Sequence, residues 1–82
     1  MHYRLKFPEE VRSQLREMPE TVRHAIGYGL FLLQEDLSGN VKKLKGFRSR
    51  YRLRVGDHRV IFELDKDLII VYGVGHRKDI YK

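Results

Sequence analysis

The amino-terminal half of the chain shows two different spacings of hydrophobic residues. Tyr3, Leu5 and Phe7 alternate with charged residues, a period of two that is typical of a half-buried strand. After Pro8 the spacing becomes helical, and two amphipathic helices are predicted, one on each side of Pro19. The helices are expected to bury Val11, Leu15 and Met18 in the first, and Val22, Ile26, Leu30 and Leu33 in the second. The segment "LSGN", residues 37–40, is predicted to end the second helix.

The carboxy-terminal half is expected to form three strands, at residues 51–55, 58–65 and 68–75. Tight turns at Gly56-Asp57 and at residues 65–67 join them, and Gly73 and Gly75 suggest a bulge or a close approach in the last strand. Residues 41–50 are interpreted as a basic connector. The 82 residues are too few to divide, so we expect one domain, 1–82. Its order is β-α-α-β-β-β, an α+β fold with two helices on one face of a mainly antiparallel four-stranded sheet.

The segment "YRLRVGDHRV", residues 51–60, predicts a strand register. With Gly56-Asp57 as the two-residue loop, Leu53 lies opposite Val60 and Arg54 lies opposite Arg59. One face then belongs to the core, while Arg52, Arg54 and Arg59 share the other face, which the helices leave open. Like charges directly opposite each other destabilise a ladder by several tenths to about 1 kcal/mol. We interpret this conflict as a sign that an anion is the intended partner of the guanidiniums.

The net charge of +6 is unevenly distributed. Residues 1–40 hold five Lys/Arg and six Asp/Glu, a net charge of −1, whereas residues 41–82 hold twelve and five, a net charge of +7. The segment 41–54 contains seven basic residues and no acid. This asymmetry favours a polyanionic partner, and the alternative interpretation is a basic surface that only aids solubility.

Several classes of protein are disfavoured by the sequence. Without cysteine there is no disulfide framework and no thiolate metal site, which fits a reducing cytoplasm. The start "MHYRLKFPEE" lacks a signal pattern, and the longest apolar run, "LIIVYGVG", is too short to span a bilayer. No histidines and carboxylates have convincing metal-ligand spacing. We therefore expect a soluble cytoplasmic protein without a metal or cofactor site.

The open sheet face is the candidate site. The last strand leads towards the same end as the Gly56-Asp57 turn, so His76, Arg77, Lys78 and Tyr81 are expected to join the arginines there. Guanidiniums bind phosphate oxygens in bidentate fashion, and single-stranded bases stack on aromatic rings. Phe47, Tyr51, Tyr72 and Tyr81 are the available rings, although Tyr51 is expected to face the core and Tyr72 to be structural. The predicted phosphate-binding residues are Lys43, Lys45, Arg48, Arg50, Arg52 and Lys78, with Lys42, Lys43 and Lys45 alternatively forming a solvated loop.

The carboxy-terminal half resembles a known family. "KLKGFRSRYRLRVGDHRVIFELDKDLIIVYGVGHRKDIY" is similar to the signature half of the RelE/ParE superfamily of bacterial toxins, with the Leu-x-Gly, Tyr-Arg-Leu-Arg and Val-Gly-His-Arg-x-x-x-Tyr patterns of its RelE branch. The resemblance implies a toxin of a type II toxin–antitoxin system. It further implies an endoribonuclease that enters the ribosomal A site, cuts mRNA there and inhibits translation. In that reaction the ribose 2′-oxygen attacks the adjacent phosphate and expels the 5′-oxygen of the next nucleotide.

The resemblance also implies roles for residues. Arg59 and Arg77 match the phosphate-stabilising arginines, and Tyr81 matches the terminal tyrosine that stacks on a base or orients the ribose. Arg52 and Arg54 stand where some members carry a pair of basic residues, often lysines, and an arginine cannot easily act as a base. His76 is favoured slightly over His58 as general base. The predicted catalytic set is thus Arg54, Arg59, His76, Arg77 and Tyr81, and Arg59→Ala or Arg77→Ala is expected to abolish toxicity while leaving the fold intact.

Two alternatives stay open. The ParE branch shares the scaffold but inhibits DNA gyrase, and a silent RNA-binding module would use the same basic face without cleaving RNA. The resemblance to the RelE branch implies that mRNA, the ribosomal A site and a cognate antitoxin are the partners. An acidic, flexible antitoxin segment would mask the basic face and become ordered as it binds.

Overall fold

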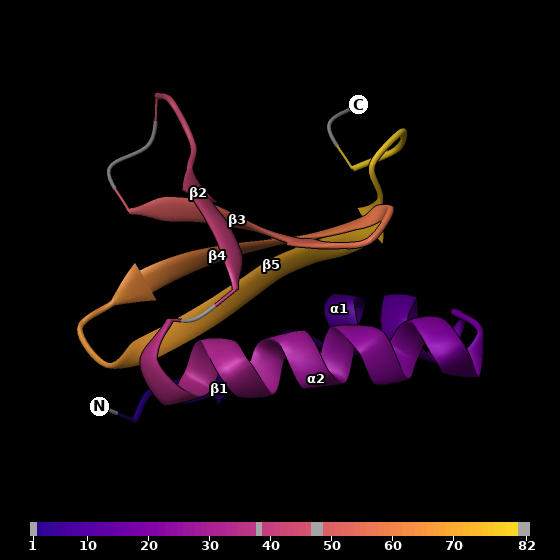
Figure 1. Ribbon diagram of the computed structural model, residues 1–82, viewed down its shortest axis with the longest axis horizontal. Coiled ribbons are helices and arrows are strands. Elements are labelled where there is room, and N and C mark those ends of the chain that lie inside the picture. Colours follow the sequence, from indigo (N-terminus) through magenta and orange to yellow (C-terminus); the bar gives the residue numbers. More distant parts are fainter. Residues whose placement is uncertain (1, 38, 47–48, 81–82) are drawn as a thin grey trace.

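The computed structural model describes residues 2–37, 39–46 and 49–80. Its elements follow each other along the chain as shown in Figure 1. They are β1 (Arg4–Lys6), α1 (Glu9–Arg16), α2 (Glu20–Asp36), β2 (Asn40–Lys43), β3 (Arg50–Val55), β4 (His58–Asp65) and β5 (Leu68–His76).

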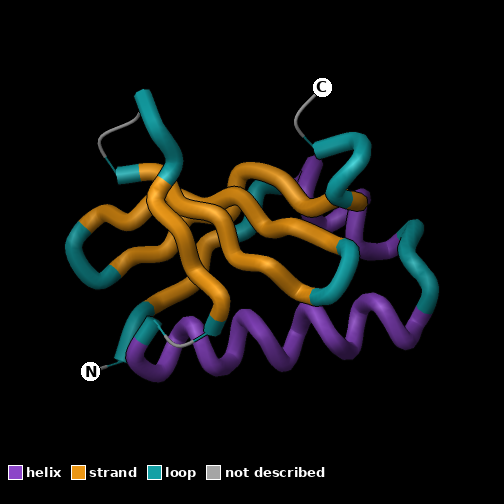
Figure 2. The backbone as a smooth tube through the Cα atoms, turned by 45° about the horizontal axis from the view of Figure 1, so that its top comes forward, coloured by secondary structure: helices purple, strands orange, loops and turns teal. Residues whose placement is uncertain are grey.

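The strands form one mixed sheet with the order β1-β5-β4-β3-β2. Neighbouring strands are antiparallel except at the β1 edge, where Arg4–Lys6 runs parallel to residues 68–70 of β5. Both helices lie on one side of this sheet, with α1 against β5 and α2 against β3; Figure 2 shows the same two layers from a tilted view. The predicted α+β fold, with two helices on one face of a mainly antiparallel sheet, is confirmed.

The expectation of four strands is wrong, because the sheet has five. The additional strand, β2, occupies the start of the segment that we interpreted as a connector, and it pairs with β3 so that Val41 lies opposite Leu53. Val41 is its one partly buried residue, and the other residues of β2 are exposed. A short edge strand rich in lysine resists pairing with other chains, but it carries too little hydrophobic alternation to be predicted from sequence.

Polar contacts hold the two helices in their predicted places. Pro8 and Pro19 each precede a helix, and Arg23 donates hydrogen bonds to the Arg16 and Met18 carbonyl oxygens at 3.2 and 3.0 Å. These bonds satisfy acceptors that the end of α1 leaves without an intrahelical partner. The second helix ends at Leu37, whose φ of 62° is left-handed and whose N–H donates to the Leu33 carbonyl oxygen. No helix in the described part of the chain is long and apolar enough to cross a membrane.

The hydrophobic core lies between the helices and the sheet. Ile26, Leu30 and Leu33 of α2 are buried, as their spacing predicts. Gly29 brings α2 close to β3, because a Cβ at that position would lie 3.1 Å from Val55 Cγ2. The other buried hydrophobic residues are Val11, Leu53, Val60, Phe62, Ile69, Val71 and Val74.

A bulge in β5 decides which residues reach each face of the sheet. Phe62 pairs with Val71, but its neighbour Ile61 pairs with Gly73, so Tyr72 is an extra residue on β5. The Val74 N–H beside the bulge donates to Gln14 Oε1 of α1 at 3.2 Å. The bulge suggested by the glycines is confirmed, and it reverses the facing of every residue of β5 that follows it.

Candidate nucleic-acid interface

The face of the sheet opposite the helices collects basic side chains, and we call it the arginine face. The predicted hairpin register is confirmed, because Arg54 lies opposite Arg59 and Leu53 opposite Val60. A second pair of like charges follows from β2, where Lys42 lies opposite Arg52. Near the hairpin the arginine face carries Lys42, Arg50, Arg52, Arg54 and Arg59.

Arg59 does not stand on an open surface. It is only 6% exposed, and its Nη1 donates hydrogen bonds of 2.9 Å to the carbonyl oxygens of Gly56 and His58. The β3–β4 turn therefore supplies part of the negative partner that we expected an external anion to provide. A buried guanidinium that holds a turn contributes to the fold, so we expect Arg59→Ala to lower stability, whereas the sequence alone predicts an intact fold.

Arg52 differs from Arg59 in its hydrogen bonding. Its Nε is buried and has no hydrogen-bond partner among the described residues, while Lys42 and Ile61 flank it on the neighbouring strands. A buried donor without an acceptor costs about 1–3 kcal/mol. Arg54, two residues along β3, is exposed. The middle of the arginine face thus offers guanidinium donors suited to an oxyanion.

The chain after β5 folds over the arginine face beside the β3–β4 turn. Arg77 donates its N–H to the Asp57 carbonyl oxygen at 2.8 Å, and its Nε lies 3.8 Å from Asp57 Oδ1. Ile80 Cδ1 lies 3.4 Å from the positions that a Cβ would occupy on Gly73 and Gly75. Figure 1 shows this segment on the side of the sheet away from the helices. The expected convergence of Arg77 on the turn is confirmed, but the face there is covered rather than open.

His76 is not brought to the arginine face. After the bulge it pairs with His58, which shares the helix-facing side with Val60; the two imidazole rings lie 5.5 Å apart, nearly perpendicular. His76 Nδ1 accepts a hydrogen bond of 3.1 Å from the Lys78 N–H. A neutral imidazole has one acceptor nitrogen, so in this arrangement the lone pair that a general base needs is already occupied. Uninterrupted alternation would have turned His76 to the other face.

Tyr72 lies in a polar cluster on the arginine face. Its hydroxyl donates to Glu63 Oε2 at 2.7 Å, Ser49 Oγ donates to Glu63 Oε1 at 3.3 Å, and Arg50 Cζ stands 4.6 Å from the ring centroid. The hydrogen bond to Glu63 raises the pKa of Tyr72. Tyr51, in contrast, stacks on Phe62 with ring centroids 5.5 Å apart, on the core side as predicted. Tyr72 lies on this side because it follows core-facing Val71, before the bulge reverses the alternation.

The remaining predicted residues are scattered. Lys43 is exposed, but its pairing with Tyr51 turns it to the helix-facing side. Lys45 and Lys78 are exposed in the turns after β2 and β5. Phe47, Arg48 and Tyr81 lie outside the described residues.

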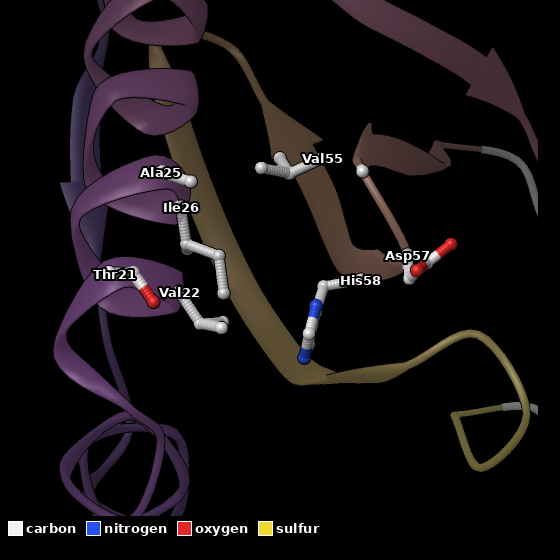
Figure 3. A pocket seen from close by; sticks show the side chains of 8 residues that line it. Thr21, Val22, Ala25, Ile26, Val55, Asp57 and His58 are labelled. Atoms are coloured by element: carbon white, nitrogen blue, oxygen red, sulfur yellow. The ribbon is translucent and has the colours of Figure 1, made fainter.

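A separate cavity of about 300 Å³ lies between α2 and the β3–β4 turn. Val22 and Ile26 point into it from the helix and His58 from the strand, whereas Asp57 points away (Figure 3). It is on the helix side of the sheet, away from the arginine face. Within the described ranges no three His, Asp or Glu residues are grouped closely enough to hold a metal ion.

Comparison with known proteins gives one family and several related structures. The family model described as the ParE toxin of the type II toxin–antitoxin system, parDE, matches residues 5–81. Toxin RelE3 of Methanocaldococcus jannaschii is 48% identical over 46 residues, which are 56% of this chain and 52% of that protein. The match thus spans about half the length of that relative.

Two solved complexes contain chains of the same fold. The RelB-RelE antitoxin-toxin complex from Methanococcus jannaschii has a chain with 33% identity and a TM-score of 0.78, covering 92% of this chain and 93% of its own. The archaeal RelE-RelB complex from Pyrococcus horikoshii OT3 has one with 25% identity and a TM-score of 0.80, covering 96% and 99%.

Proposed function

Because the chain belongs to the ParE toxin family of type II toxin–antitoxin systems, and within the RelE/ParE superfamily to the RelE branch, we propose that it is a metal-independent endoribonuclease that cuts mRNA in the ribosomal A site. This activity would inhibit translation and would place the protein in the cytoplasm, where ribosomes are found.

The arrangement of like charges on the arginine face is the observation that carries this proposal. Arg54 faces Arg59 and Lys42 faces Arg52 across neighbouring strands, and the buried Arg52 Nε has no partner among the described residues. A phosphodiester bound by the exposed guanidinium of Arg54 would relieve this repulsion. The arginine face is therefore suited to bind an RNA backbone.

In the reaction, the 2′-oxygen gives up its proton to water and forms a bond to phosphorus as the bond to the 5′-oxygen breaks. The 5′-oxygen takes up a proton from water, and negative charge builds up on the phosphorane oxygens in between. We assign Arg52 and Arg54 to the phosphate. Exposed Arg77, which lies beside the β3–β4 turn, is assigned to the same developing negative charge. Arg59 holds the β3–β4 turn through its hydrogen bonds and adds positive potential to the arginine face. Tyr81 is assigned to the ribose or a base, on the basis of the family motif. Lys45, Arg48, Arg50 and Lys78 would contact flanking phosphates, whereas Lys43 faces the helix side and would not.

Proton transfer needs a different account from the one that the sequence suggested. His76 can remove the 2′-hydroxyl proton only after Lys78 releases Nδ1. We therefore propose that His76 acts first as a positioning residue, which holds the turn that carries Arg77. Alignment of the 2′-oxygen and electrostatic stabilisation would then supply most of the rate enhancement.

The proposed partner in the absence of RNA is a cognate antitoxin. The related structures are complexes of RelE with RelB, and the net charge of +7 in residues 41–82 favours an acidic segment that becomes ordered on binding. We expect that segment to hold an excess of Asp and Glu.

A gyrase inhibitor is the second candidate function. It is favoured by the description of the matching family model as a ParE toxin. The arginine face distinguishes the two candidates, because gyrase inhibition does not require guanidiniums arranged around one phosphate.

The deciding experiment is induction of the chain in bacteria, with mapping of mRNA 5′ ends and a gyrase supercoiling assay in parallel. Arg54→Ala and Arg77→Ala remove proposed phosphate contacts, and Arg12→Ala on exposed α1 is the matched control. Cuts within translated frames that disappear in the first two variants and persist in the control would support the nuclease. Intact mRNA with inhibited supercoiling would support the second candidate. Salt-sensitive RNA binding without cuts would support a silent RNA-binding module.

A further inference from the structure

An aromatic ring stands on the arginine face at a place that the proposed mechanism does not use, because the alternation that buries Val71 in the core turns Tyr72 to the other side of the sheet. Tyr72 is the extra residue of the bulge, and its hydroxyl reaches Glu63, which lies opposite Arg50. The ring therefore shares the arginine face with the β3 guanidiniums.

The ring is held in a fixed orientation although much of it is exposed. Arg50 covers it, with Cζ 4.6 Å from the centroid, and the 2.7 Å hydrogen bond to Glu63 fixes the direction of the hydroxyl. Ser49 binds the other oxygen of the same carboxylate. Even so, 44% of Tyr72 remains exposed. A ring oriented in advance loses little conformational entropy when a ligand binds to it.

The surroundings of Tyr72 differ from those of the other exposed aromatic residues. Tyr28 and Phe31 are 64% and 54% exposed, but they belong to α2, on the other side of the sheet. Tyr72 stands beside a row of arginines on β3. An aromatic platform along a basic track is the usual composition of a surface that binds single-stranded nucleic acid.

We infer that Tyr72 is a base-stacking site for the mRNA, which receives the base of a nucleotide next to the phosphate held by Arg52 and Arg54. Strands β3 and β5 are separated by β4, which sets them roughly 10 Å apart. The ribose and base of one nucleotide can bridge that distance. Every base has a π-face, so this site adds affinity and register with little preference among bases. The inference rests on the proposed function and deepens it.

The test uses single-turnover cleavage of mRNA on ribosomes with an empty A site. One nucleotide at a time is replaced by an abasic ribonucleotide, which keeps the 2′-hydroxyl and the phosphate. For the wild-type protein we expect one position at which loss of the base slows cleavage by roughly 5- to 100-fold. In Tyr72→Leu this penalty should vanish, because the ring that stacks on the base is absent.

Two variants separate stacking from a structural role. Tyr72→Phe keeps the ring and loses the hydroxyl that donates to Glu63, so the penalty at that position should persist. Tyr28→Leu removes an exposed tyrosine from α2 and should leave the whole profile unchanged. If Tyr72→Leu retains every base-dependent penalty of the wild type, this inference is overturned while the nuclease stands. If the wild-type protein cuts no mRNA, the inference falls together with the proposed function.

Discussion

The two faces of the β3–β4 hairpin follow from one register and have opposite energetics. On the helix side, Leu53 lies opposite Val60 and Tyr51 stacks on Phe62. On the arginine face Arg54 lies opposite Arg59, a pair of like charges next to the turn. The alternation that places apolar side chains in the core also forces the arginines together.

This difference separates the source of stability from the source of binding. Burial on the helix side supplies the favourable free energy that holds the sheet in shape. The rigid sheet can then tolerate repulsion on its other side, where an anionic ligand would find guanidiniums already oriented. Substitutions on the two faces should therefore affect different measurements.

The largest change in stability is expected from the core side. Phe62 is fully buried, and truncation of a buried phenylalanine costs about 3–5 kcal/mol. We expect Phe62→Ala to lower the free energy of unfolding by that amount in urea titrations followed by circular dichroism. A loss below about 1 kcal/mol would show that the core does not depend on this ring.

Arg59→Ala is expected to have the next largest effect. The substitution removes two hydrogen bonds to turn carbonyl oxygens from a side chain that is 6% exposed. We predict a loss of about 1–3 kcal/mol in the free energy of unfolding, measured in the same titrations. An unchanged or increased stability would restore the view of Arg59 as a purely ligand-binding residue.

Arg54→Ala should separate the stability of the fold from the cleavage of mRNA. Arg54 is exposed and lies opposite Arg59, so its removal relieves repulsion and should leave stability unchanged or raise it by up to about 1 kcal/mol. Cleavage of ribosome-bound mRNA should fall by about 10²–10³-fold, the usual cost of losing one stabilising donor. Full activity in this variant would remove Arg54 from the site.

The smallest effect concerns pH. The hydrogen bond to Glu63, followed by burial and the charge of Glu63, raises the pKa of Tyr72 above the 10.0 of an ordinary tyrosine. The folded pKa exceeds the unfolded one, so the contribution to stability is complete below the unfolded pKa. It is lost as pH rises through the folded pKa. Tyrosinate absorbance should show one late-titrating group that Tyr72→Phe removes and Glu63→Ala shifts to lower pH. Identical titration curves for the three proteins would contradict the assignment.

Sequence reasoning succeeded where a local signal decides the structure. The Gly56-Asp57 loop, flanked by alternating residues, determined the register of β3 against β4, and prolines with helical spacing located both helices. It missed β2, where Val41 alone supplies the apolar signal. Local patterns were sufficient for most of the fold.

The candidate site was harder to predict because it depends on contacts between distant segments. The side of the sheet taken by His76 is set by one extra residue at Tyr72, and the bulge is secured by Gln14 of α1. Ile80, which follows the last strand, lies over Gly75, the strand partner of Arg59. The sequence identified the arginines but not their different burial.

The pairing of β1 with β5 has a consequence for synthesis of the protein. Residues 4–6 are made first, yet their partners are residues 68–70, so the sheet cannot be completed until nearly all of the described chain has left the ribosome. Contacts between segments so far apart in sequence form late. The proposed activity would therefore begin only after synthesis, and a cognate antitoxin would meet a chain that is still folding.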